Sequence, residues 1–292
     1  MKCFFHSADF DGKASGAIVK FNNPECELFP AYYGMRFPWH KIKKNEIIYM
    51  VDFGLQPFDQ MIRLANSCQK LIWIDHHISA IKDHDTLWKA TGFHIAGLRN
   101  TEYSACELTW QYFNTKPIPE PLKLLGRYDV WDIGYDPKVL PFQYGMRALN
   151  PIAEDIVWRR LGLDIVVITL IDGIVDDGVS ILKYIGSDYD RYMKRCGFQI
   201  EFEGYKALCV NRGFTSSHIF EGHYNPEIHD IMISFCYTND YNWRVSLYTE
   251  KDEIDCSEIA KRYGGGGHPK ASGFQCDKLP FKLKPSNLVI LS

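Results

Sequence analysis

Short apolar runs that end in acidic or histidine residues mark the first half of the chain. These runs are Lys2–Phe5 before His6, Ile47–Val51 before Asp52, and Leu71–Ile74 before Asp75. Helix-like stretches lie between them, so the pattern predicts the β-α-β order of a mostly parallel sheet. Ligands bind such sheets beyond the carboxyl ends of the strands, where all three polar groups fall. The pattern therefore predicts one shared site.

Helical patterns follow the third run. Ser104-Ala105-Cys106-Glu107 is a capping box, which predicts a helix through Phe113. The next element, about 122–133, brings Asp129 and Asp132 within reach of the site if it docks on the sheet, and the pattern does not choose between them. From about residue 155 to 197 the sequence is largely helical and is interpreted as helices that end in a connector.

Near residue 198 the largely helical pattern gives way to short runs rich in β-forming residues, which are separated by residues typical of turns. The expected elements are strands at Ala207–Val210, Ile231–Tyr237 and Trp243–Tyr248 and a helix at Cys256–Tyr263. We therefore predict a first domain over 1–170, a helical connector over 171–197, and a second domain over 198–292.

Composition restricts the partners. Apolar residues make up 46% of the chain, charged residues 24%, and the net charge is −3. This charge argues against electrostatic binding of long duplex nucleic acid over a wide surface but is compatible with a small anionic ligand in a local site. The nine cysteines are scattered and lack C-x-x-C pairs, so we expect reduced core thiols. Without a signal peptide or a long apolar run, a cytoplasmic location and no membrane contact are expected.

The segment His6-Ser7-Ala8-Asp9-Phe10-Asp11-Gly12 places a histidine and two carboxylates at a predicted strand end. Hard divalent cations prefer carboxylate oxygen, and mixed histidine and carboxylate ligands suit Mn²⁺. A capped turn with solvated aspartates is the alternative for this segment.

Asp52 and the Asp75-His76-His77 triplet repeat the pattern at the next two strand ends. Taken alone, Asp52 is typical of a turn or helix cap, and the alternative for the triplet is that it has no role in a site. Several such clusters fall where the site of an α/β sheet is expected. Their joint occurrence favours a shared functional site over separate structural roles.

Gly264–Gly267 followed by His268 adds a different signal. Four glycines let backbone amides approach an anion, and the imidazole supplies another donor. A flexible loop is the alternative, although the position after a helix favours an ordered turn. The remaining histidines are expected on surfaces or loops: His40, His84, His94, His218, His223 and His229.

Together, the segments HSADFDG, VDFG, IDHH, YDVWD and GGGGHPKASGF resemble the ordered motif set of the DHH phosphoesterase family. The last resembles the glycine motif of the DHH-associated C-terminal domain, and the resemblance covers nearly the whole chain. The most similar branch is that of oligoribonucleases (nano-RNases) and cyclic-nucleotide phosphodiesterases. The resemblance implies an α/β fold: a mostly parallel sheet flanked by helices, a smaller mixed-sheet domain, and an active site in the cleft between them.

Carried over motif by motif, the resemblance implies a site with two Mn²⁺ ions, with Mg²⁺ as the alternative metal. One ion would be held by His6, Asp9 and Asp52, and the other by Asp11, Asp52, His76 and Asp129. Asp52 would then bridge the ions, with Asp52, His76 and His77 catalytic. Asp75 would orient a neighbouring histidine. Substrate would contact His77, the amides of Gly264, Gly265, Gly266 and Gly267, and His268.

The chain departs from the family pattern in one strand of the second domain. Tyr248 stands where the family often has an arginine, and Arg244 lies on the same face of the strand as a candidate replacement for binding substrate.

Two metals can lower the pKa of a shared water towards about 7. We therefore expect metal-activated hydroxide to hydrolyse short single-stranded oligoribonucleotides, or linear or cyclic dinucleotides, to mononucleotides. An exopolyphosphatase or pyrophosphatase is the alternative within the enzyme class, and a nucleotide sensor without activity is the alternative outside it. The sequence leaves a homodimer open.

Overall fold

The computed structural model describes residues 1–282. The chain divides into two compact units, Met1–Leu182 and Lys183–Ser292, and the division falls inside helix α8 (Ile168–Cys196). Gly173, Gly178 and Gly186 lie within this single helix of 29 residues and do not end it. Over the described residues, no helix has both the length and the apolar character needed to cross a membrane.

The first unit is built on a four-stranded sheet in which every neighbouring pair is parallel, in the order β2-β1-β3-β4. The strands are β1 (Lys2–His6), β2 (Glu27–Ala31), β3 (Ile47–Val51) and β4 (Lys70–Ile74). The expected mostly parallel sheet is thus confirmed. Strand β2 was not predicted, because Pro30 interrupts its pattern. Proline is tolerated here because β2 is at the edge of the sheet.

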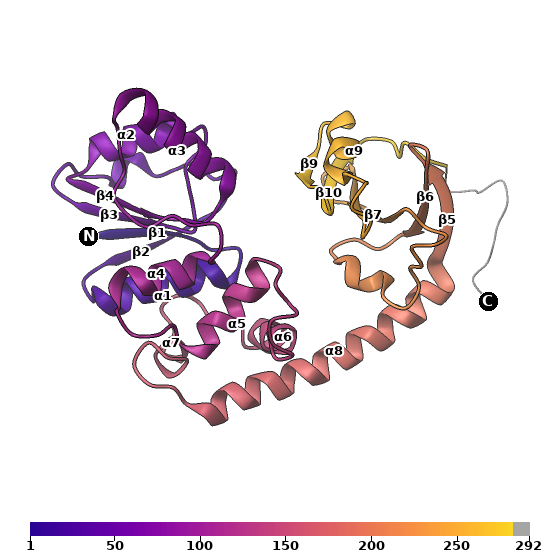
Figure 1. Cartoon of the computed structure of the whole chain (residues 1–292), viewed down its shortest axis with the longest axis horizontal. Helices are drawn as coiled ribbons and strands as arrows, with labels where there is room; N and C mark the ends of the chain where they lie inside the picture. The colour runs from indigo at the N-terminus through magenta and orange to yellow at the C-terminus, as the bar shows by residue number, and fades with distance from the viewer. Residues whose placement is uncertain (283–292) are drawn as a thin grey trace. The chain divides into compact units, whose positions relative to one another are not determined.

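Helices cover both faces of this sheet, α2 and α3 on one side and α1 and α4 on the other (Figure 1). The helices of the unit are α1 (Phe10–Asn22), α2 (Asp59–Ser67), α3 (Ile78–Thr91), α4 (Ala105–Phe113), α5 (Glu120–Asp129), α6 (Val139–Leu149), α7 (Val157–Arg160) and the short 3-10 helix η1 (Trp39–Lys41). Successive side chains of β1 point to opposite faces of the sheet, so they contribute to two separate parts of the hydrophobic core. Phe4 packs with Trp73 on one face, and Phe5 packs with Leu108 on the other. The Ser104–Glu107 capping box is present as expected.

The second unit contains a six-stranded mixed sheet in the order β5-β6-β7-β8-β10-β9. Its elements are β5 (Gly197–Phe202), β6 (Tyr205–Val210), η2 (Ser217–Phe220), β7 (Ile231–Tyr237), β8 (Trp243–Tyr248), α9 (Cys256–Arg262), β9 (Gly266–His268) and β10 (Ala271–Cys276). Strands β6 and β7 are parallel and the other pairs antiparallel. The expected mixed-sheet domain is confirmed.

Two histidines expected on surfaces or loops are instead buried. His84 and His229 are each only 1% exposed. Backbone amides explain how this is possible, because Ile95 N donates to His84 Nε2 at 3.3 Å and Asn225 N donates to His229 Nδ1 at 3.0 Å. The cysteine expectation also needs correction, because Cys196 is exposed at the end of α8 and is not a core thiol.

Candidate metal centre

The carboxyl ends of β1, β3 and β4 bring three sequence motifs together. Asp52, the first residue after β3, is buried and has φ of 52°. This left-handed conformation is unfavourable for most residues but is accessible to aspartate, and such strain is common at functional sites. The Asp52 amide donates to Ile74 O at 3.0 Å, which ties the strained residue to the end of β4.

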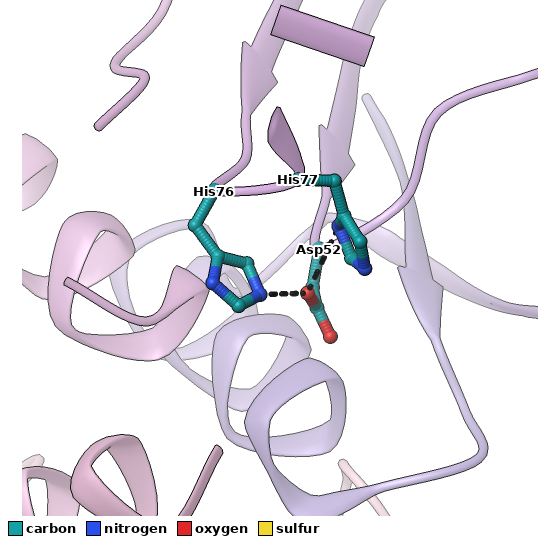
Figure 2. Close-up of side chains that lie close together, drawn as sticks. All are labelled: Asp52, His76 and His77. Atoms are coloured by element: carbon teal, nitrogen blue, oxygen red, sulfur yellow. Dashed lines mark ion pairs between the residues drawn. The ribbon is translucent and has the colours of Figure 1, made fainter. Parts of the chain in front are cut away.

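The two carboxylate oxygens of Asp52 face different partners. Oδ2 lies 3.5 Å from His6 Nδ1, whereas Oδ1 lies 3.4 Å from His76 Nε2. Figure 2 shows His76 and His77 directed from the loop after β4 towards Asp52, with His77 Nδ1 3.9 Å from Oδ1. One buried carboxylate is therefore shared between groups on two sides.

The first group consists of His6, Asp9 and Asp52, whose ligand atoms lie within 4.8 Å of one another. Asp9 caps helix α1 by accepting from Gly12 N at 2.9 Å through Oδ1, while Oδ2 lies 2.9 Å from His6 Nδ1. The capped-turn interpretation is therefore right for Asp9 and compatible with a ligand role. Gly12 is required here, because a Cβ would lie 2.0 Å from His6 O.

The second group consists of Asp11, His76 and Asp129. His76 Nε2 lies 3.8 Å from Asp11 Oδ2 and 3.2 Å from Asp129 Oδ2. Asp129 ends helix α5, whereas its rival Asp132 is exposed and 3.8 Å from Arg127. The structure therefore brings Asp129 into the cluster.

Asp11 is anchored by a contact that the sequence does not reveal. Its carboxylate accepts hydrogen bonds from Ala105 N and Cys106 N, each at 2.8 Å, at the first turn of α4. The positive end of the helix dipole stabilises a buried carboxylate in this position. Helix α4 therefore contributes to the site through its backbone.

Asp75 orients His77. The fully buried carboxylate lies 2.6 Å from His77 Nδ1 and accepts from the Trp73 indole at 3.0 Å. Burial alone would raise the pKa of Asp75, but the hydrogen bond from His77 outweighs it and lowers that pKa. The pKa of His77 is raised in turn, because Asp75 outweighs the effect of burial.

The crowded carboxylates strongly perturb one another. Burial, followed by repulsion from Asp11, raises the pKa of Asp52 to about 6, and the same two causes raise the pKa of Asp129 to about 9. Burial would lower the pKa of His6 and His76, but the nearby Asp52 carboxylate, together with the other carboxylates of the cluster, raises both to about 10. Without a cation, protons must balance this excess negative charge.

The residues present fit divalent cations. His6 Nδ1 and Asp52 Oδ1 are buried and lack a well-directed hydrogen bond, although each lies near a group of opposite charge. Buried polar atoms usually have partners, so two such atoms facing one cluster call for an explanation. A mixed oxygen and imidazole set suits Mn²⁺ or Mg²⁺.

One aromatic neighbour of the cluster was not foreseen. The Tyr33 ring centroid lies 5.7 Å from that of His6 and 6.3 Å from that of His77, and the side chain is 48% exposed. Tyr33 follows β2, the strand that the sequence did not predict, and no motif identifies it.

The second unit contains a hollow of about 640 Å³, here called the glycine hollow. Its lining includes Gly264–Gly267, Arg244 and Tyr248. The glycine tract is ordered, as expected: Gly264 and Gly265 follow helix α9, Gly266 and Gly267 belong to β9, and His268 is exposed at the end of that strand. Tyr248 donates from its hydroxyl to Thr215 O at 3.0 Å. Arg244 and the four glycines thus share one hollow.

Comparisons with known proteins point in the same direction. No protein-family model matches the chain. Two curated relatives cover 79% of it: the oligoribonuclease NrnB of Bacillus subtilis, 28% identical, and the uncharacterized protein R106 of Acanthamoeba polyphaga mimivirus, 22% identical. The aligned region spans only 59% and 53% of those two proteins.

Solved structures share the fold. The pGpG-specific phosphodiesterase PggH of Vibrio cholerae matches with a TM-score of 0.55 at 16% identity, over 94% of this chain and 92% of that protein. The DHH domain of a member of a family of ribosomal proteins matches with a TM-score of 0.59 at 14% identity, over 94% and 82%. These matches show that the chain shares the fold of these two proteins.

Proposed function

We propose that the chain is a metal-dependent phosphodiesterase of the DHH family that cleaves short oligoribonucleotides or dinucleotides. The observation that carries the proposal is the position of Asp52. Its two oxygens face His6 on one side and His76 on the other, at 3.5 and 3.4 Å. This arrangement suits a carboxylate shared by two cations.

Each ligand group would hold one cation. The first would be held by His6, Asp9 and Asp52, and the second by Asp11, Asp52, His76 and Asp129. When bound, two divalent cations would lower the pKa of water towards about 7 and neutralise charge on phosphoryl oxygens. We propose Mn²⁺ for this pair because the set combines imidazole with carboxylate ligands.

His77 would contact the substrate. Asp75 occupies His77 Nδ1 at 2.6 Å, which fixes the ring and leaves Nε2 as its second donor. Because the pKa of His77 is raised by Asp75, the protonated ring can donate a charge-assisted hydrogen bond to a phosphoryl oxygen. The glycine hollow would supply Arg244 for a second phosphate or terminal nucleotide. The amides of Gly264 and Gly265 are not free for this role, because they donate to Lys261 O and Ala260 O at 3.0 and 2.9 Å.

The substrate class rests on the relatives. NrnB is named an oligoribonuclease and PggH a pGpG-specific phosphodiesterase. Both names describe proteins that act on very short nucleic acids, and a chain of net charge −3 suits short substrates better than long polymers. We therefore place dinucleotides and short RNA ahead of polyphosphate.

A substrate panel tests the proposal. Turnover of pApA, pGpG, an RNA trimer, cyclic di-AMP and polyphosphate is measured with Mn²⁺, Mg²⁺ or chelator. We expect metal-dependent release of mononucleotides by the wild type and by Asp83→Asn, an exposed carboxylate control, and loss of activity in Asp52→Asn. Turnover of polyphosphate alone would favour the phosphoanhydride hydrolase, and nucleotide binding without turnover would favour a sensor.

A further inference from the structure

A second hollow lies in the first unit, beside helices α4 and α5. It has a volume of about 550 Å³, within the range of small-molecule sites, and we call it the α4–α5 hollow. Its lining contains three cationic side chains, two tyrosines and one carboxylate. These are Lys116, Lys123, Arg127, Tyr103, Tyr135 and Glu107.

The charge of this hollow is positive. Glu107 is buried and already satisfied, because its Oε2 lies 2.5 Å from Arg127 Nη2 and accepts from Ser104 N at 3.0 Å. Neither Lys116 nor Lys123 has an ion pair or a side-chain hydrogen bond to any residue from 1 to 282. Two uncompensated lysines on the wall of one concavity, in a chain of net charge −3, favour an anion.

The aromatic side chains of the hollow indicate that the anionic ligand also carries a planar ring such as a nucleobase. Tyr135 is 55% exposed and Tyr103 is partly buried, and both line the hollow. Exposed aromatic rings beside cationic groups are the usual means of holding a nucleotide, since the ring stacks on the base while lysine pairs with the phosphate.

The hollow is built on the same two helices as the metal cluster but is separate from it. Helix α4 donates its first amides to Asp11, and α5 ends at Asp129. The hollow instead uses the side chains of Glu107, Lys123 and Arg127 on those helices, and no residue of the two proposed ligand groups lines it. It can therefore be tested without the metal centre.

We propose that the α4–α5 hollow binds one nucleotide unit, with Lys116 and Lys123 on its phosphate and Tyr135 against its base. The nucleotide is either free or part of an oligomer whose other end is at the metal centre. The second alternative rests on the proposed function, whereas the first does not.

Binding of 5′-AMP and of inorganic phosphate in chelator, which keeps divalent cations out of the metal centre, tests the site. We expect Lys116→Ala/Lys123→Ala to bind 5′-AMP at least about tenfold more weakly than wild type, because charge-assisted bonds are lost. Lys82→Ala/Lys89→Ala removes two exposed lysines of α3 and should bind like wild type. Equal binding by the two double variants, or no binding by wild type, would overturn the proposal.

Two further measurements sharpen the result. Tyr135→Ala should weaken 5′-AMP binding but leave inorganic phosphate binding unchanged. If the variant keeps the wild-type preference for 5′-AMP over phosphate, the proposed contact between Tyr135 and the base is wrong.

Turnover of a dinucleotide and of a pentanucleotide then distinguishes a free nucleotide from one that is part of the substrate. If Lys116→Ala/Lys123→Ala slows only the pentanucleotide, the unit belongs to the substrate, and if it slows neither while 5′-AMP binding is lost, the nucleotide is free. Unchanged melting temperatures exclude misfolding.

Discussion

Replacing Asp52 with asparagine should change stability in opposite directions with and without metal. Asparagine is nearly isosteric and tolerates the positive φ of 52° at this position. In the metal-free protein the substitution removes an ionised carboxylate from a buried site next to Asp11. In the metal-loaded protein it removes the proposed shared ligand.

The raised pKa of Asp52 gives the size of the expected change in the free energy of unfolding. A rise from 3.8 to about 6 corresponds to about 3 kcal/mol of unfavourable ionisation in the folded, metal-free state. Because the folded-state pKa is above the unfolded value, wild-type stability falls as pH rises through this window, and the full cost is present above about pH 6. Near pH 7, metal-free Asp52→Asn should therefore be more stable by up to about 3 kcal/mol. The difference should disappear below about pH 4.

Metal reverses the order. A cation present at about 1,000 times its dissociation constant stabilises the wild type by about 4.1 kcal/mol, which exceeds the cost of about 3 kcal/mol at Asp52, and the variant should lose most of this gain. Thermal melting in chelator and in Mn²⁺ measures both effects, since 1 kcal/mol moves Tm by about 2–4 °C for a unit of this size. Asp83→Asn should follow the wild type throughout. A metal-free Asp52→Asn that melts below wild type, or that keeps the full gain in Mn²⁺, would refute the reasoning.

Three further predictions concern neighbouring features. In the glycine tract, Gly265→Ala should lower Tm because its Cβ would lie 2.1 Å from Gly273 O, whereas Gly266→Ala, with open space around it, should not; equal melting of the two would contradict the packing. Asp75→Asn should lower activity about 10- to 100-fold, and NMR titration should show the pKa of His77 falling towards its ordinary value. Ser104→Ala removes the cap that accepts from Glu107 N and should cost about 1 kcal/mol in chemical denaturation; no loss would argue against the cap.

Much of the architecture was predictable because it is encoded in short segments. The continuous buried runs of β1, β3 and β4, and the polar residues at their ends, follow from patterns within short stretches of sequence. The capping box at Ser104 is likewise a four-residue signal. Strand β2 was missed because Pro30 interrupts its short apolar run.

What the sequence by itself determined is the mostly parallel character of the first sheet, the change to a mixed sheet, and the motifs at the strand ends. Only the tertiary structure decided which atoms of those motifs meet. Asp11 binds amides 94 and 95 residues away, the two oxygens of Asp52 face opposite partners, and Asp129 rather than Asp132 reaches His76. The physical reason is that local pattern fixes which face a side chain occupies, whereas contacts between distant segments depend on how helices α4 and α5 pack against the sheet.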